Sequence, residues 1–414
     1  MTAEELTASR RAVGPVVRLA IACRITPVAM AMISVGFAVI AAVWLTLGTS
    51  RADGVALVAM VAVFVICHTS RVLAGSLITR PAPDERALAS VVEWGLAACG
   101  VLAEVVSYTG IALAVSLHPA IASPPGSALS STFVARLGGA GTTGVWQLAI
   151  IAVMLAVLLP LVDVSLHSGS GEGTRLRLFG LPGDVRLPLA GAAVLLAGAR
   201  AAFLLAGVLG VAALGAAAID GAMSGRRRGE IRGYRGDGLL AVKIGGLVRG
   251  RLPPMPPLFV GLLVTGMLVA LGLRNLSGLL LLTPVEAMLL AAFGSWHPHD
   301  GRSDWLVPPL LQAAEYVFLT EAGFAGHVWP PVILALVAAA GFRHLDLAYR
   351  VHGGLASGID RRGLGWEGRM IVAGIAAAAG ISLVVYPALA VYLWWLNARD
   401  WAVGWSGGHA AVDS

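Results

Sequence analysis

The chain has 414 residues, of which 57% are hydrophobic and 13% are charged, and its net charge is +6. Soluble domains use roughly 45–50% apolar residues, so this composition excludes an ordinary soluble domain. Apolar runs long enough to cross a ~30 Å hydrocarbon core recur from Val28 to Leu396. We therefore expect an all-α, polytopic bundle of membrane helices, with the lipid bilayer as its main partner and no nucleic-acid partner.

Candidate spans follow one another along the chain, separated by proline, glycine and charged residues. The first six lie at residues 28–47, 55–75, 88–117, 143–163, 187–199 and 201–219. The next six lie at residues 255–273, 279–294, 303–325, 328–342, 369–381 and 383–397. The run from Leu187 to Ile219 could instead form one long helix, but Gly198 offers a turn that would divide it into a hairpin.

The placement of basic residues favours the hairpin. With the amino terminus in the cytoplasm, only Arg51, Arg136, Arg200 and Arg274 of the 29 Lys and Arg residues face outward. A single long helix would place the basic loop Gly225 to Gly238 outside, against the rule that basic loops stay cytoplasmic. We therefore predict about 12 spans in the plasma membrane, with both termini cytoplasmic.

Landmarks recur in the same order in the two sets of six spans, which indicates an internal duplication. They are Arg-x-x-Pro before the first span, Trp-x9-Glu in the third and Arg-x3-Ala-Gly at the start of the fifth. They begin at Arg24, Trp94 and Arg186 in the first set, and at Arg251, Trp305 and Arg369 in the second. Because six is even, the repeats are parallel. We predict a first repeat at residues 1–224, a basic cytoplasmic linker at 225–253 and a second repeat at 254–414.

This six-span layout, with polar residues between its second and third spans, resembles the CDP-alcohol phosphatidyltransferase superfamily. That family carries Asp-x-x-Asp-Gly-x-x-Ala-Arg, a short spacer and Gly-x3-Asp-x3-Asp. Its aspartates hold divalent metals on a CDP-linked donor, and the last aspartate deprotonates the acceptor hydroxyl. The resemblance implies transfer of a phospho-alcohol group in phospholipid or envelope-lipid synthesis.

The first repeat departs from this pattern at its acidic positions. Cys67 and Ser70 stand where the first two aspartates are expected, and Leu96 and Gly100 stand where the last two are expected. No carboxylate of the metal-binding pattern is left. The resemblance therefore implies that the first repeat is a catalytically dead copy.

The second repeat keeps part of the pattern in the stretch HPHDGRSDW, His297 to Trp305. Asp300 is retained with the glycine that follows it, and His297 replaces the first aspartate. Val307 and Leu311 stand in place of the last two aspartates, so the base is not identified. Asp304 is an additional carboxylate outside the pattern.

We predict from this resemblance that Asp300 and Asp304 are catalytic and that the cluster binds one divalent metal. The predicted metal ligands are His297, His299, Asp300 and Asp304. The predicted metal is Mg or Mn, and Zn or Fe is the alternative. Mixed histidine and carboxylate ligands suit Mn, Zn or Fe, whereas a hard metal such as Mg normally takes more oxygen ligands. The predicted substrate-binding residues, which would hold a CDP-linked donor, are Arg302, Arg251, Glu315 and Arg343. The alternative is that HPHDGRSDW is a polar loop that caps the next helix.

The chain from about Arg186 onward also resembles an uncharacterised actinobacterial membrane-protein family that is found joined to such transferase modules. The segments that carry this resemblance are RGRLPPMPP, HPHDGRSDWLVPPLLQAAEY, FRHLDLAYR and GLGWEGRM. This resemblance brings no known reaction with it.

Other polar groups leave two interpretations open. The charged residues of FRHLDLAYRVH, Phe342 to His352, could bind a phosphate group or form a helix end that faces water. Glu104 and Glu315 could line a polar cavity or pair with Arg, Trp or backbone groups inside the bundle. The basic linker sets orientation or contacts anionic lipid. We expect the three cysteines, Cys23, Cys67 and Cys99, to belong to the core.

Two further functions remain as alternatives to a transferase. The protein could be a catalytically inactive scaffold or regulator that binds a partner enzyme of envelope-lipid synthesis. It could also be a transporter, because parallel repeats occur in carriers. The sequence lacks paired broken helices with charged residues at mid-membrane, which makes transport the less attractive alternative.

Overall fold

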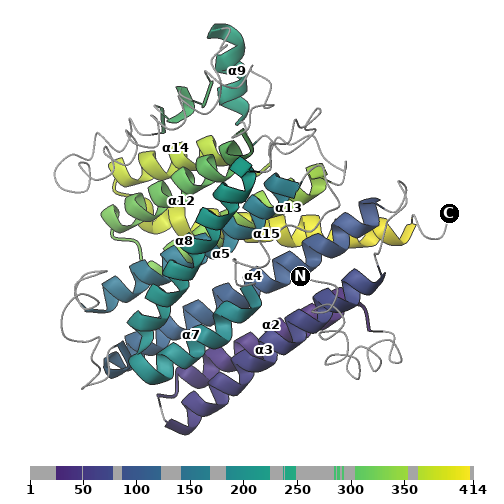
Figure 1. Ribbon diagram of the computed structural model, residues 1–414. Helices are drawn as coiled ribbons and strands as arrows, with labels where there is room; N and C mark the ends of the chain where they lie inside the picture. The colour runs from purple at the N-terminus through teal and green to yellow at the C-terminus, as the bar shows by residue number, and fades with distance from the viewer. Residues whose placement is uncertain are drawn as a thin grey trace. The chain divides into compact units, whose positions relative to one another are not determined.

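The computed structural model describes most of the chain as helix (Figure 1). The described residues are 25–48, 50–77, 86–122, 141–167, 183–223, 236, 238–248, 284–285, 287–289, 291–292, 304–352 and 362–410. Within these ranges every regular element is helical and no strand occurs. The predicted all-α class is therefore confirmed for the described part of the chain.

The chain divides into two compact units, which we describe separately. The first contains residues 1–159 and 172–220, and the second contains residues 160–171 and 221–414. The segment 225–253, predicted to be a linker, falls within the second unit.

The helices before residue 224 match the first six predicted spans. They are α2 (Pro27–Leu45), α3 (Ser50–Leu77), α4 (Arg86–Leu117), α5 (Gly141–His167), α7 (Gly183–Ala197) and α8 (Ala199–Met223), with a short 3-10 turn η1 (Pro119–Ala122) after α4. Thr26 caps α2 by accepting a hydrogen bond from the Ala29 amide, at 3.2 Å, and Pro27 opens the helix. Proline suits this position because its fixed φ matches a first helical turn.

The later helices match four predicted spans and add one element. They are α9 (Leu239–Val248), η3 (Asp304–Leu306), α12 (Val307–Ala325), α13 (Pro330–His352), α14 (Gly365–Ala378) and α15 (Ser382–Ala410). The predicted span 255–273 lies outside the described residues, and 279–294 is described only in short helical pieces. Helix α9 lies where a linker was predicted.

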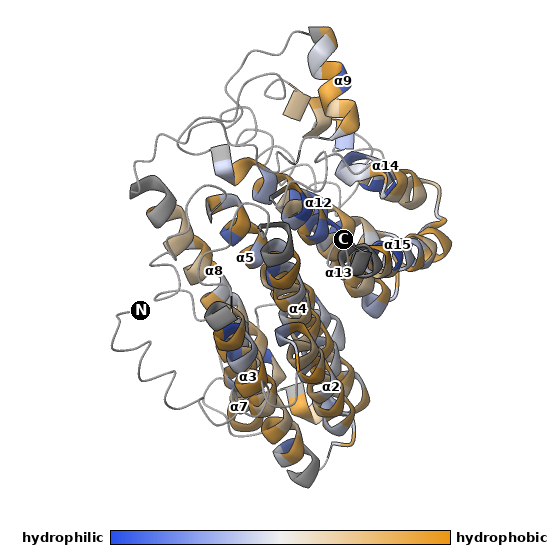
Figure 2. Ribbon diagram, turned by 90° about the vertical axis from the view of Figure 1, so that its right-hand side faces the viewer, coloured by the Kyte–Doolittle hydropathy of each residue, from blue (hydrophilic) through white to orange (hydrophobic). Residues whose placement is uncertain are grey.

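Six of the described helices are long and apolar enough to cross a membrane. Their apolar stretches are Pro27–Leu45, Asp53–Ala74, Ser90–Leu117, Thr142–Leu166, Ala199–Ile219 and Pro330–Val351. Helix α7 has a shorter apolar stretch, Val185–Ala197. Length and composition therefore fit a membrane helical bundle, and Figure 2 shows the mainly hydrophobic character of these helices.

In the first unit, α2 packs against α3 and α4, and α3 packs against α7 (Figure 1). Helices α2 and α4 approach closely at Gly110, where an added Cβ would lie 2.4 Å from the Ala42 Cβ. Antiparallel to α2, α3 places the Cys67 thiol 3.1 Å from the Ser34 hydroxyl oxygen. Cys67 and Cys99 are buried, as predicted, and Cys23 lies outside the described residues.

The predicted division of the run from Leu187 to Ile219 is confirmed. Helix α7 ends at Ala197 and α8 begins at Ala199, and Gly198 between them has a φ of +88°. Residues with a Cβ rarely adopt positive φ, so glycine is the residue that permits this break.

In the second unit, α12, α13, α14 and α15 alternate in direction. Glu315 of α12 meets His344 near the end of α13, so these two helices are antiparallel. Helices α13 and α15 are parallel, because the Trp394 indole donates to the Ala335 carbonyl and the Asn397 amide donates to the Ala339 carbonyl. The end of α12 meets the start of α15 at Gly326, where a Cβ would lie 2.4 Å from the hydroxyl oxygen of Ser382.

This alternation brings four helix ends together. The start of α12, the end of α13, the start of α14 and the end of α15 lie at one end of the second unit. We call it the charged end, because most of the buried charged side chains described in this unit gather there. Figure 2 shows hydrophilic residues on the ribbons of α12, α14 and α15.

Candidate functional site

A buried ion-pair network joins three helices near the charged end. The carboxylate of Glu315 on α12 accepts hydrogen bonds from Arg369 on α14, at 2.5 Å from Nε and 3.1 Å from Nη2. Arg369 Nη1 also donates to the Gly363 carbonyl, at 2.7 Å. Glu315 and Arg369 are both 0% exposed. We call Glu315, His344 and Arg369 the Glu315 network.

His344 occupies the third position in this network. Its Nε2 lies 2.6 Å from Glu315 Oε2 and 2.8 Å from Arg369 Nη2. A ring nitrogen either donates a hydrogen bond to the carboxylate or accepts one from the guanidinium N–H, and it cannot do both at once. The proton at this nitrogen therefore decides whether His344 reinforces the carboxylate or the arginine.

A second cluster joins α13 to the end of α15. Arg343 donates to the Asp400 carboxylate at 2.5 Å, and Arg350 donates to the Asp346 carboxylate at 2.9 Å and to the Asp400 carbonyl at 2.9 Å. Arg343, His344 and Asp346 are all buried. The expectation that these residues form a helix end facing water is therefore wrong for those three, because the parallel packing of α13 and α15 encloses them.

Glu367 fixes α9 against the start of α14. Its carboxylate accepts hydrogen bonds from the backbone amides of Ala241, at 2.7 Å, and Leu240, at 3.4 Å. The Trp366 indole donates to the Gly236 carbonyl at 3.1 Å. Burial raises the pKa of the Glu367 carboxyl, while the amides at the α9 terminus act in the opposite direction. A buried carboxylate at a helix N-terminus is the favourable arrangement for its charge.

Three of the four predicted metal ligands, His297, His299 and Asp300, lie outside the described residues, as do the predicted substrate-binding residues Arg302 and Arg251. Asp304 is described in its backbone, where it opens η3 immediately before α12. The cluster HPHDGRSDW therefore leads directly into the charged end.

The start of α12 is apolar. Its N-cap residue is Leu306, which makes no side-chain capping bond, and Pro308 and Pro309 in the first turn lack an N–H group. Val307 and Leu311 are buried. The first two turns of α12, residues 307–314, carry no carboxylate.

Two predicted substrate-binding residues are held inside the bundle. Glu315 belongs to the Glu315 network, and Arg343 pairs with Asp400. For Glu315 and Glu104 the interpretation that they pair inside the bundle is confirmed. The described residues do not include His297, His299 or Asp300. Among them, no group of three His, Cys, Asp or Glu side chains is placed to hold a metal.

The first unit contains a similar buried ion pair. Arg186 on α7 donates to the Glu104 carboxylate on α4 at 2.9 Å, and both side chains are buried. The Tyr108 hydroxyl lies 3.5 Å from the other oxygen of this carboxylate. Elsewhere on α4, Leu96 packs with Ala31, Ala74 and Cys99 in an apolar cluster.

Three contributors to the charged end carried no predicted role: Arg369, Asp400 and Glu367. Arg369 was identified in the sequence as the start of a repeated Arg-x3-Ala-Gly pattern, but that pattern did not indicate Glu315 as its partner. Asp400 and Glu367 gave no comparable signal, because their partners are far away in the sequence. Arg343 and Asp400, for example, are 57 residues apart.

A family model described as "Family of unknown function (DUF5941)" matches residues 230–397. The chain is similar to that family over this segment, which contains the Glu315 network, Glu367 and HPHDGRSDW. No curated protein matches the chain, and no solved structure matches it. The similarity therefore adds no reaction and no ligand to the site.

Proposed function

We propose that the protein is a multi-pass membrane protein built from two CDP-alcohol phosphatidyltransferase-like repeats. In this proposal the second repeat binds a CDP-linked donor at HPHDGRSDW and transfers its phospho-alcohol group in lipid synthesis. The observation that carries the proposal is the charged end, into which HPHDGRSDW leads.

Matching contacts in the two units support the repeat arrangement. In each unit a buried glutamate of the third helix pairs with an arginine near the start of the fifth, Glu104 with Arg186 and Glu315 with Arg369. In each unit a glycine with positive φ separates the fifth and sixth helices, at Gly198 and at Gly380. An aromatic residue also joins α4 to α8, where Tyr108 meets Phe203, and α12 to α15, where the Tyr386 hydroxyl donates to the Leu319 carbonyl.

The chemistry of HPHDGRSDW supports phosphate-ligand binding in the second repeat alone. His297, His299, Asp300 and Asp304 form a mixed nitrogen and oxygen donor set that suits Mn²⁺ or Zn²⁺. A bound divalent metal would neutralise the charge of the donor's diphosphate, whose cleavage transfers the phospho-alcohol group to the acceptor hydroxyl and releases CMP. Arg302 would contact a phosphate oxygen, for which the guanidinium geometry is well suited.

A second candidate function is an inactive scaffold of a lipid-synthesis enzyme. It is favoured by Val307 and Leu311, which occupy the positions of the family's last two aspartates with buried apolar side chains. Neither residue can take a proton from an acceptor hydroxyl. The Glu315 carboxylate, one turn further along α12, is already engaged by Arg369 and His344.

The experiment measures Mn²⁺-dependent binding of CDP and CMP to the full-length protein in detergent. We expect saturable binding that is lost in Asp300→Ala and retained in Asp220→Ala, a matched carboxylate removal at the end of α8. Metal-independent binding, or binding that survives Asp300→Ala, would contradict the donor site. Turnover of a radiolabelled CDP-alcohol then separates the candidates, because a scaffold gives binding without product.

A further inference from the structure

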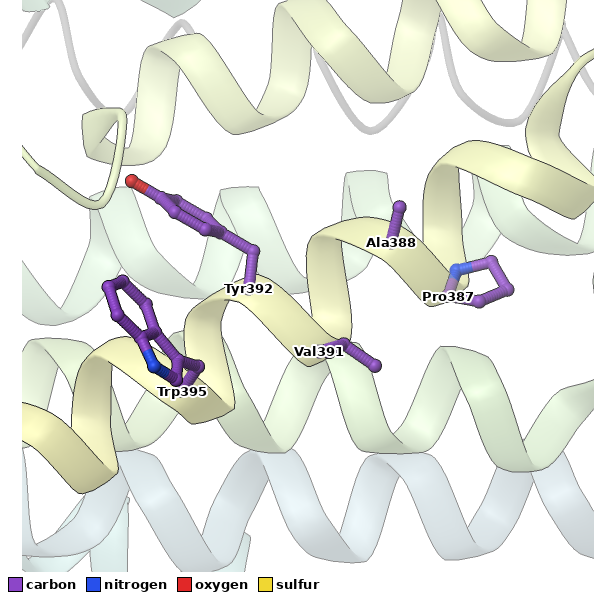
Figure 3. Close-up of a pocket in the computed structure, with 5 residues that line it drawn as sticks. All are labelled: Pro387, Ala388, Val391, Tyr392 and Trp395. Atoms are coloured by element: carbon purple, nitrogen blue, oxygen red, sulfur yellow. The ribbon is translucent and has the colours of Figure 1, made fainter.

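An apolar groove runs along α15 in the second unit. Its lining residues are Pro387, Ala388, Val391, Tyr392 and Trp395, all from this one helix (Figure 3). In the described structure Val391 is 69% exposed and Trp395 is 54% exposed. Such a surface favours contact with an apolar partner such as an acyl chain, because exposed apolar area is unfavourable in water.

The groove has a polar terminus with two cations. The guanidinium carbon of Arg399 lies 5.6 Å from the centre of the Trp395 ring. The Tyr392 hydroxyl donates to the Arg362 carbonyl at 2.8 Å, which brings Arg362 beside the same aromatic pair. The Arg362 side chain is 64% exposed. Both cations therefore stand where the apolar lining ends.

The nearest acidic residue, Asp400, is shared by two arginines, so it does not neutralise both Arg362 and Arg399. Asp400 directs one carboxylate oxygen to Arg343, at 2.5 Å, and its other oxygen lies 3.9 Å from Arg362. Arg399 has its described contact with the Trp395 ring. The groove terminus therefore keeps a positive character that complements an anion.

The groove is oriented as a lipid would be. Along α15 it runs from Pro387, in the second turn of the helix, to Trp395, and so it runs toward the charged end. Tyr392 and Trp395 lie at the change from apolar to charged residues, as aromatic residues do at membrane interfaces. An acyl chain fits the apolar part and a phosphate fits the two arginines.

We propose that this groove binds one anionic glycerophospholipid, with an acyl chain on Val391 and Trp395 and the phosphate on Arg362 and Arg399. The inference rests on the proposed membrane location and is independent of the site at HPHDGRSDW. Extraction of membranes at alkaline pH tests that location separately. Release of the protein by this treatment would remove the premise of the lipid site and so overturn it.

The test is native mass spectrometry of the full-length protein, delipidated and titrated with phosphatidylglycerol or phosphatidylcholine. The wild type is expected to prefer phosphatidylglycerol. Because a basic residue near the surface contributes about 1 kcal/mol, the preference should fall about fivefold for each arginine removed in Arg362→Gln and Arg399→Gln. Lys243→Gln is the matched control, because it removes an exposed cation of α9 in the same unit.

A second variant tests the apolar part without changing charge. Ala388→Trp fills the groove and is expected to weaken binding of both lipids, whereas Val208→Trp, at an exposed position of α8, is expected to leave binding unchanged. Equal binding of the two lipids by the wild type would overturn the proposal. Wild-type lipid binding by Arg362→Gln/Arg399→Gln, or by Ala388→Trp, would also overturn the proposal. This result is expected if another part of the chain occupies the groove.

Discussion

Arg369 illustrates how an apolar bundle holds a charge. Its guanidinium is fully buried, and its hydrogen bonds reach Glu315 and the Gly363 carbonyl. Removing an ion from water costs several kcal/mol, so such a charge persists only with its partner in place. The pair fixes the spacing of α12 and α14, which gives it a role in specifying the fold.

We predict that Glu315→Leu and Arg369→Leu each destabilise the protein by about 3–5 kcal/mol, because each leaves one buried charge without its partner. The double variant Glu315→Leu/Arg369→Leu should be more stable than either single variant. The measurement is the free energy of unfolding in mixed micelles.

The matched control for these variants is Lys243→Leu. Lys243 is an exposed cation on α9, so its loss should change the free energy of unfolding by about 0.5 kcal/mol or less. Equal effects of Lys243→Leu and Arg369→Leu would contradict the importance of burial.

At the scale of elements, α9 depends on two residues that its own sequence does not contain. Its amino-terminal amides are satisfied by Glu367 of α14, and the chain reaches that carboxylate through Gly238. A Cβ at Gly238 would lie 1.8 Å from the Glu367 carboxyl group. The docking of α9 therefore requires glycine at this position.

We predict that Gly238→Ala and Glu367→Leu both release α9 from α14. The first introduces a steric clash, and the second removes the acceptor of two amide hydrogen bonds. Hydrogen exchange of residues 239–248 should become faster in both variants. Gly215→Ala on α8 is the control, because a Cβ there meets nothing within 4 Å. Unchanged exchange in Gly238→Ala would refute this account of the docking.

At the scale of the whole molecule, charge and helix direction are both consistent with the predicted topology, in which both termini are cytoplasmic. Helices alternate in direction within the second unit, and its charged residues gather at one end. Basic residues are retained on the cytoplasmic side of membranes, so this end is expected to be cytoplasmic. Two sets of six spans would then return both termini to that side.

We predict that residues 130 and 224 lie on opposite sides of the membrane. In a background without Cys23, Cys67 and Cys99, Ser130→Cys should react with an impermeant maleimide on intact cells. Ser224→Cys and Ser414→Cys should react only after permeabilisation. Labelling of Ser224→Cys in intact cells would contradict the topology.

The sequence alone determined where most helices lie. Long apolar runs and their breakers set the limits of α2 to α8 and of α12 to α15, because helix formation and the burial of apolar side chains depend on neighbouring residues. Gly198 was identified as a break for the same local reason.

Only the tertiary structure decided which charges meet. Glu104 pairs with an arginine 82 residues away, and Glu315 with one 54 residues away. The same packing turns Arg343 and Asp346 inward and docks α9 on Glu367. Such partners follow from helix packing, which a one-dimensional pattern does not contain. Burying an unpaired charge costs free energy, so each buried charged side chain described in this apolar chain lies next to a partner of opposite charge or a hydrogen-bonding group.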